Sequence, residues 1–244
     1  MSLLQLLYEK IFEVSAELIE KVKAAGQIEL KKIASTPEEP TATTSETATK
    51  IAGNHSVDLV VIGISTGGPQ ALKRLIPQFP ADFPVPILMV MHMPVGYTEM
   101  YASKLNEQSQ LEVKEAAEGD EIKPGCVFLA RAGRHLSVVR ESNGKVVTHL
   151  DARPFDTLHK PSVDVLFQSV AEVYRHRVLG VVMTGMGSDG KQGAAWIKSQ
   201  GGLVFTEAES SCVVYGMPCS VVEAGLSDKS IALEDMAHAI RKVV

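Results

Sequence analysis

The chain has 244 residues, of which 45% are hydrophobic and 22% are charged, and its formal net charge at pH 7 is −5. These values are typical of a globular protein that buries a core without help from disulfides or metals. The acidic balance excludes a strong electrostatic attraction to nucleic acid, which depends on clustered Lys and Arg, so we expect no nucleic-acid partner.

The cysteines and the apolar runs bear on the compartment in which the protein works. Cys126, Cys212 and Cys219 form no Cys-x-x-Cys pair and are odd in number, which argues against a disulfide framework or a zinc site. The N-terminal stretch contains Glu9 and Lys10 and lacks the layout of a signal peptide. Since no apolar run approaches the length of a membrane-spanning helix, we expect a cytoplasmic protein without membrane insertion.

The first part of the chain predicts a helix and a linker. Residues 1–34 predict a helix, because Leu4, Leu7 and Ile11 begin an apolar stripe with spacings of three and four. Residues 35–52 are rich in Thr, Ser, Glu and Pro, and they predict a flexible linker because such a segment cannot bury a core. We expect a globular domain over residues 53–244.

The rest of the chain alternates between aliphatic strands and amphipathic helices. This alternation predicts an α/β fold, a doubly wound and mostly parallel sheet with helices on both faces. Asn143-Gly144 predicts an antiparallel hairpin added to it, between about 125 and 150. Strands are expected near 57–64, 85–93, 126–132, 135–141, 145–151, 178–185 and 202–208, and helices near 69–79, 96–108, 162–175, 191–201 and 233–243.

The first candidate site is the turn after the strand at 57–64, because ligands of such sheets bind beyond the carboxyl ends of the strands. Gly63-Ile64-Ser65-Thr66-Gly67 fits the Gly-x-Ser-x-Gly pattern, which exposes a nucleophilic serine between a strand and a helix. Ser65 as a helix N-cap, or the loop as a phosphate cradle, explains the same residues. The motif alone leaves these three interpretations open.

A nucleophilic serine needs a base, and the base needs a group that orients it. His92 follows the predicted strand at 85–93 and has the right position, while His135 and His159 fall near other strand or loop ends and remain candidates. Asp189 lies in the Gly-rich turn after the strand at 178–185, where a carboxylate can hold an imidazole. An Asp at this point is also a common helix N-cap.

The same turn supports a function of a different class. Gly185, Gly187 and Gly190 form Gly-x-Gly-x-x-Gly between a strand and a helix, and Glu207 lies where the acidic ribose partner of a dinucleotide site is expected. A nucleotide-binding module is therefore the alternative to an enzyme. Asp189 would place a negative charge beside the pyrophosphate, which counts against it. A third interpretation is an interaction protein in which these residues only cap helices.

Several blocks of the sequence together resemble the catalytic domain of the CheB family, the protein-glutamate methylesterases of bacterial chemotaxis. The blocks are GISTGGPQAL, MHMPVGYTEMYASKLN, HKPSVDVLFQSV, VVMTGMGSDGKQGAAWIKSQGG and AESSCVVYGMP, within about residues 57 to 243. The resemblance implies a doubly wound sheet and a serine esterase that needs no metal or cofactor. Its substrates would be glutamate γ-methyl esters on the cytoplasmic domains of methylated chemoreceptors, with methanol released, and it would also deamidate receptor glutamines.

The resemblance assigns roles to individual residues. The nucleophile falls on Ser65, the base on His92 and the orienting acid on Asp189. The backbone N–H of Met186 would help to bind the oxyanion, and Thr66 would line the site.

The family usually carries a phosphoacceptor receiver domain before a linker. Here residues 1–34 resemble only the last helix of that domain, and no acidic pocket for a phosphoryl group can be assembled from them. We therefore expect that the receiver domain is missing from this chain or that regulation by phosphorylation is absent. In either case we expect an esterase that no receiver restrains.

Overall fold

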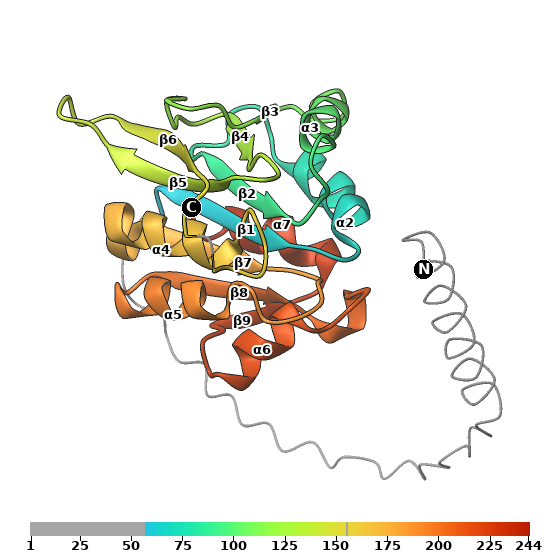
Figure 1. Cartoon of the computed structure of the whole chain (residues 1–244). Helices are drawn as coiled ribbons and strands as arrows, with labels where there is room; N and C mark the ends of the chain where they lie inside the picture. The colour runs from blue at the N-terminus through green and yellow to red at the C-terminus, as the bar shows by residue number, and fades with distance from the viewer. Residues whose placement is uncertain (1–56, 155) are drawn as a thin grey trace, which may run out of the picture. The chain divides into compact units, whose positions relative to one another are not determined.

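The structure is a computed structural model, and it describes residues 57–154 and 156–244. These residues form one parallel sheet of seven strands, with helices on both faces, and a second, two-stranded sheet (Figure 1). The doubly wound α/β fold expected from the sequence is therefore confirmed. The helix predicted at 1–34 and the linker predicted at 35–52 lie outside the described residues, so they stay predictions.

The large sheet has the strand order β3-β4-β2-β1-β7-β8-β9, and all of its neighbouring strands are parallel. Strands β5 and β6 pair antiparallel in the smaller sheet, as the Asn143-Gly144 signal predicts. The strands are β1 (Leu59–Ile64), β2 (Ile87–Met91), β3 (Glu112–Glu115), β4 (Cys126–Leu129), β5 (His135–Arg140), β6 (Val146–Asp151), β7 (Val178–Val182), β8 (Leu203–Glu207) and β9 (Lys229–Ile231).

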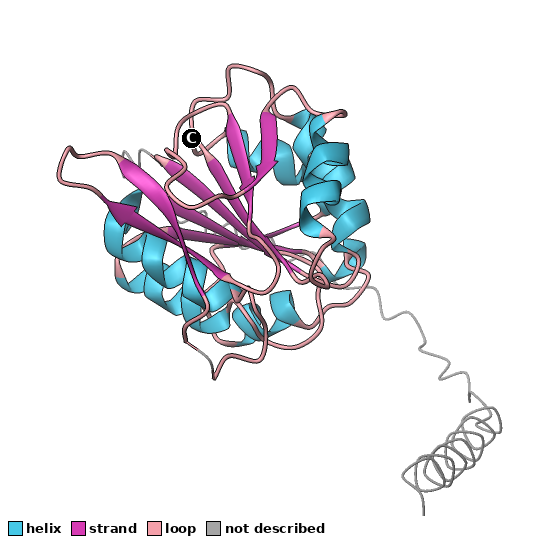
Figure 2. Cartoon of the chain, turned by 45° about the horizontal axis from the view of Figure 1, so that its top comes forward, coloured by secondary structure: helices cyan, strands magenta, loops and turns pink. Residues whose placement is uncertain are grey.

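The helices cover the large sheet on both faces (Figure 2). Helices α2, α3 and α7 pack on one face, and α4, α5 and α6 pack on the other together with β5 and β6. None of the helices in the described part of the chain has the length and apolar character that a membrane crossing requires. The helices are α2 (Gly68–Leu75), α3 (Thr98–Asn106), α4 (Val163–Tyr174), α5 (Lys191–Ser199), α6 (Met217–Glu223) and α7 (Leu233–Arg241), with short 3-10 turns η1 (Ile76–Gln78), η2 (Arg175–Arg177) and η3 (Glu209–Ser211).

Strand β1 lies at the point where the order of the strands reverses. It pairs with β2 on one side and with β7 on the other, because the chain first extends the sheet through β2 and later returns to build its other half. Every residue of β1 is buried, as expected for a strand covered on both faces. In sheets of this kind ligands bind at such a reversal, beyond the carboxyl ends of the strands.

The structure corrects the predicted strands and helices in two respects. The antiparallel hairpin expected between about 125 and 150 is confirmed as β5–β6, but it begins only at His135 and forms a sheet of its own, while β4 is a parallel member of the large sheet. Strands β3 and β9 and helix α6 were not predicted. The two strands are short, lie at the sheet edges and carry charged residues, and α6 has only seven residues. None of the three has the aliphatic run or long periodicity that indicates an element.

Candidate active site

Ser65 is the first residue after β1 and lies in a turn of small residues. Its N–H donates to Thr184 O at 3.0 Å, and its carbonyl accepts from Gly68 N at 2.8 Å. Gly67 has a φ of 87°, and a Cβ at this position would lie 2.7 Å from Val213. Helix α2 begins after Gly67 without a side-chain cap, so the interpretation of Ser65 as its N-cap is wrong.

Gly185, in the turn after β7, lies directly against Ser65. A Cβ on Gly185 would lie 2.8 Å from Ser65 Cβ and 2.3 Å from Met217 Sδ, so a side chain has no room there. The Gly185 carbonyl accepts from Gly216 N at 3.1 Å and from Met217 N at 2.9 Å, at the start of α6. The Gly185 C=O and the Met186 N–H belong to the same trans peptide unit, in which the two groups point in opposite directions. The Met186 N–H therefore points away from Gly216 N and Met217 N. It has no acceptor within the described residues.

Thr184 connects the turn after β1 with the turn after β7. It is 1% exposed, its carbonyl accepts from Ser65 N, and its Oγ1 donates to Thr66 O at 2.9 Å. The same Oγ1 accepts from Val213 N at 3.1 Å and from Val214 N at 3.0 Å. Thr184 therefore holds the loop before α6 against the turn that contains Ser65, while Thr66 itself is exposed beside Ser65.

His92 is the first residue after β2, and its side chain pairs with Asp189. His92 Nε2 lies 2.8 Å from Asp189 Oδ2, and the two side chains are 10% and 9% exposed. The backbone N–H of His92 donates to the carbonyl oxygen of Ile64 at 3.2 Å, which places His92 beside the end of β1. In the part of the chain that the structure describes, His92 Nδ1 is the one buried side-chain nitrogen or oxygen without a hydrogen-bond partner. With the Nε2 proton directed to Asp189, Nδ1 carries a lone pair that can take a proton.

The N-terminus of α4 holds the Asp189 carboxylate. Oδ1 accepts from Ser162 Oγ at 2.9 Å and from Asp164 N at 3.0 Å, and Oδ2 accepts from Val163 N at 2.8 Å. Burial by itself raises the pKa of Asp189, but hydrogen bonds from His92 and from these three donors lower it to about 2. The carboxylate is therefore ionised near neutral pH and favours a positive charge on His92.

Asp189 does not cap the helix that follows it, so that interpretation is wrong. The cap of α5 comes from Asp164, whose Oδ1 accepts from Gly190 N at 2.9 Å and from Gly193 N at 2.7 Å. Burial raises the pKa of Asp164 above its ordinary value, and the charge of Asp189 raises it further. Sequence reasoning missed Asp164 and Ser162, although Ser-x-Asp before an apolar run is a recognisable helix start.

Two features of the structure disfavour a dinucleotide at Gly185, Gly187 and Gly190. First, Asp164 already accepts from the N–H groups at the start of α5 that a pyrophosphate would need. Second, Glu207 is fully buried, and its carboxylate accepts from Thr184 N at 2.9 Å and from Ser211 Oγ at 3.0 Å. Within the described residues no group of three or more His, Cys, Asp and Glu side chains is arranged to hold a metal ion.

The other candidate histidines differ in their relation to His92. His135 is 1% exposed, and its Nδ1 accepts from Ser162 N at 3.2 Å while Nε2 lies 3.1 Å from Pro154 O. Both of its nitrogens are thus occupied in holding the loop before α4. His159 lies in that loop, and its ring stacks on the ring of His92 with the centroids 4.0 Å apart. A cavity of about 700 Å³ opens beside His159, with Asp189 also in its wall.

Comparisons with known proteins agree with the resemblance noted in the sequence. The family described as CheB methylesterase matches residues 60–240. The chain is 47% identical over 237 residues to protein-glutamate methylesterase/protein-glutamine glutaminase 5 of Myxococcus xanthus, covering 97% of this chain and 66% of that protein. It is 44% identical over 186 residues to the protein-glutamate methylesterase/protein-glutamine glutaminase of Colwellia psychrerythraea, covering 76% of this chain and 49% of that protein.

The chain therefore spans about half to two thirds of the length of these curated relatives. Among solved structures, the CheB methylesterase catalytic domain of Thermotoga maritima superimposes with a TM-score of 0.75 at 42% identity. The match covers 78% of this chain and 100% of that one, so the whole of that catalytic domain has a counterpart here. The chain belongs to the CheB methylesterase family.

Proposed function

We propose that this chain is a serine hydrolase that demethylates glutamate γ-methyl esters on chemoreceptors and releases methanol. Family membership supports the reaction class. The assignment of the catalytic residues depends on the hydrogen bonding of His92. Its Nε2 binds Asp189, while its buried Nδ1 has no hydrogen-bond partner within the described residues. Ser65 and His92 directly follow Ile64 and Met91, which are paired in register between β1 and β2.

In this mechanism Ser65 is the nucleophile and His92 is the general base. Ser65 Oγ attacks the γ-carbonyl carbon of the ester while His92 Nδ1 takes the hydroxyl proton. The tetrahedral intermediate then expels methoxide, which receives that proton and leaves as methanol. Water attacks the resulting acyl-serine with His92 again as base, and the products are the glutamate carboxylate and free Ser65.

The remaining site residues stabilise charge during these steps. Asp189 is the orienting acid, since its ionised carboxylate holds the Nε2 proton and favours the imidazolium form of His92. The Met186 N–H is the proposed oxyanion donor. Its peptide unit is fixed through the Gly185 carbonyl, so it need not reorganise as negative charge develops. Thr66 lines the site beside the nucleophile.

The proposed partners are the cytoplasmic domains of methylated chemoreceptors, with the reaction taking place in the cytoplasm. The same acyl chemistry applies to a glutamine side chain. There Ser65 attacks the amide carbon, His92 gives its proton to the leaving nitrogen, and ammonia is released. Deamidation of receptor glutamines is therefore part of the proposal, and the relatives named protein-glutamine glutaminase support it.

Methanol release from methylated receptor membranes tests the proposal. We expect release by the parent chain and a loss of about four or more decades in rate for Ser65→Ala, because other triads lose at least this much without their nucleophile. Ser103→Ala is the matched control, since Ser103 is an exposed serine on α3, and it should keep the parental rate. Equal release by the parent and Ser65→Ala would contradict the assignment of Ser65, and no release by the folded parent would contradict the proposed reaction.

A further inference from the structure

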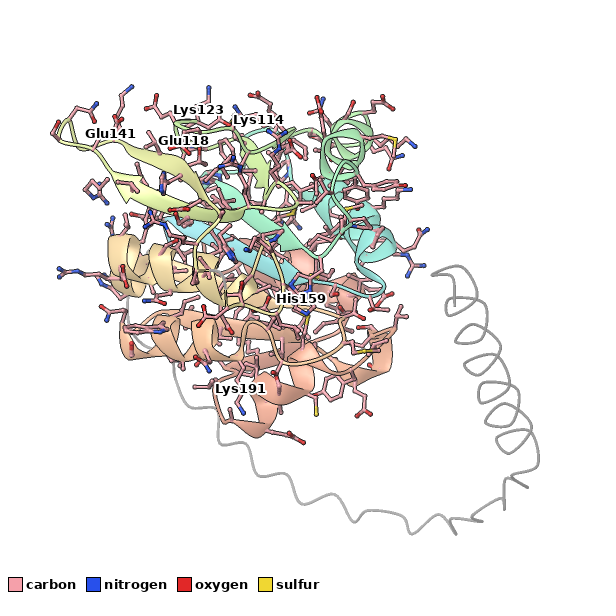
Figure 3. The ribbon with its side chains drawn as sticks, in the orientation of Figure 1. Lys114, Glu118, Lys123, Glu141, His159 and Lys191 are labelled. Atoms are coloured by element: carbon pink, nitrogen blue, oxygen red, sulfur yellow. The ribbon has the colours of Figure 1, made fainter. Side chains whose placement is uncertain are left out.

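His159 makes a contact with the reacting histidine that no step of the proposed mechanism uses. Its ring stacks on the ring of His92 with centroids 4.0 Å apart and an angle of 23° between the planes. Figure 3 labels His159 in the loop that precedes α4, among the loops at the carboxyl ends of the strands. The side chain is half-buried, and within the described part of the chain it makes no hydrogen bond that competes with the stacked arrangement.

We propose that His159 is a positioning residue that fixes the ring of His92, so that Nδ1 stays available to take the proton of Ser65. This inference rests on the proposed function. The ring of His92 makes one hydrogen bond, from Nε2 to Asp189, and its Nδ1 has no partner within the described residues, so among hydrogen bonds only this one resists rotation of the ring. Rotation about the second side-chain torsion of a histidine has a broad energy minimum. A flat ring packed against its face removes that freedom.

The charge on the two rings agrees with this role. Burial lowers the pKa of His159, and the nearby charge of His92 lowers it further, whereas Asp189 acts in the opposite direction. His159 is therefore neutral near neutral pH. When His92 takes the proton of Ser65 and becomes a cation, it faces a neutral aromatic ring instead of a second cation. A neutral partner avoids the repulsion that a second cation at this distance would exert, so it does not oppose the proton transfer.

Hydrogen bonds hold the loop that carries His159, both before and after this residue in the sequence. The Lys160 carbonyl accepts from Gly133 N at 3.0 Å, and Thr157 Oγ1 lies 3.1 Å from His135 Nε2. Farther along, Ser162 binds both His135 and Asp189. The ring of His159 is thus presented by a backbone with fixed neighbours, as a residue that positions another side chain requires.

The test compares the parent chain with His159→Ala, His159→Phe and the control Leu158→Ala. Phe keeps a flat ring without nitrogens, and Leu158 is the neighbouring residue of the same loop with a side chain that is 91% exposed. In the methanol assay we expect His159→Ala to lower kcat about tenfold to a hundredfold with KM within about twofold, because misplacing a reacting group costs this much. His159→Phe and Leu158→Ala should stay within about threefold of the parental kcat.

A second readout needs no substrate and separates failure of this inference from failure of the proposed function. In protein labelled with ¹⁵N-histidine, the Nε2–H of His92 should exchange with solvent at least about tenfold faster in His159→Ala than in the parent, because a ring that rotates breaks its bond to Asp189. His159→Phe should show the parental exchange rate. If His159→Ala does not fold, His159→Asn takes its place as a polar side chain without a ring.

A parental exchange rate in the ringless variant would overturn the inference, whatever happens to turnover. So would a His159→Phe variant as impaired as His159→Ala, since the nitrogens and not the ring would then matter. An effect on KM alone would equally assign His159 to substrate binding and overturn the positioning role. If the parent itself releases no methanol, the proposed function fails, and the exchange rates alone decide whether His159 fixes His92.

Discussion

Asp164 and Asp189 each bind the N-terminal backbone of the helix that belongs to the other. Asp189 accepts from Val163 N and Asp164 N at the start of α4, and Asp164 accepts from Gly190 N and Gly193 N at the start of α5. The carboxylate proposed to orient His92 is therefore fixed by the packing of two helices. Helix stability and the geometry of the site depend on the same four hydrogen bonds.

We expect Asp164→Ala to lower both stability and turnover. The loss of a capping carboxylate costs about 1–2 kcal/mol of unfolding free energy. Without Asp164 the start of α5 loses two hydrogen bonds, and Asp189, which lies in the turn before this helix, is displaced from His92. Urea unfolding and methanol release by the same preparations measure the two effects. Asp235→Ala is the matched control, because Asp235 lies in the first turn of α7 and is exposed. If Asp164→Ala is destabilised but its turnover is unchanged, the hydrogen bonds from Gly190 N and Gly193 N to Asp164 do not position Asp189.

The depressed pKa of Asp189 predicts how stability changes in acid. Its folded pKa of about 2 lies below the ordinary 3.8, so its contribution is present above about pH 4 and is lost as the pH falls through about 2. The shift corresponds to a contribution on the order of 2 kcal/mol. The difference in unfolding free energy between the parent and Asp189→Asn should therefore shrink by about that amount between about pH 5 and pH 2. A constant difference over this range would mean that the carboxylate is not held as described.

A methyl group at Gly185 should damage the site more than one at Gly187. A Cβ at Gly185 would lie 2.8 Å from Ser65 Cβ, whereas a Cβ at Gly187 would have no atom within 4 Å. At Gly187 only the backbone φ of 87°, which a residue with a Cβ rarely adopts, disfavours a side chain. We expect Gly185→Ala to reduce turnover by about a hundredfold or more, since it displaces the nucleophile. Gly187→Ala should cost about 1–2 kcal/mol of stability through its left-handed backbone and spare most of the activity. Equal activities of the two variants in the methanol assay would contradict the close approach of Gly185 to Ser65.

Dinucleotides and nucleoside triphosphates should not bind at the Gly-rich turn. Asp164 occupies the N–H groups that would receive a phosphate, and the buried Glu207 is bound to Thr184 N and Ser211 Oγ. Calorimetry with NAD and ATP at millimolar concentrations should give no heat beyond dilution. Saturable binding that Gly190→Ala abolishes would revive the nucleotide-binding alternative.

The sequence predicts the site residues where they follow a strong local signal. Ser65 and His92 each come directly after an aliphatic strand, and Asp189 follows β7 in a Gly-rich turn, so the rule for parallel sheets brings all three to one edge. The structure brings His92 and Asp189 into contact, and it places Ser65 beside the end of β2. Their catalytic roles remain a proposal.

Contacts that depend on tertiary packing could not be predicted in the same way. Asp164 reaches the start of α5 only because α4 and α5 lie together on one face of the sheet, and no local pattern encodes that. The contact between Gly185 and Ser65 likewise joins turns 120 residues apart in sequence. Edge strand β3 reads Glu-Val-Lys-Glu, which lacks the aliphatic run that indicates a buried strand.

Covalent labelling with a fluorophosphonate tests the central claim most directly, because it reports on the nucleophile without requiring the natural substrate. The reagent forms a stable phosphonate ester with an activated serine and releases fluoride. We predict a single modified residue, Ser65, by peptide mass spectrometry, and a labelling rate on the order of a thousandfold lower in His92→Ala, which has lost the base. Labelling of a different serine, or an equal rate in His92→Ala, would contradict the proposed triad.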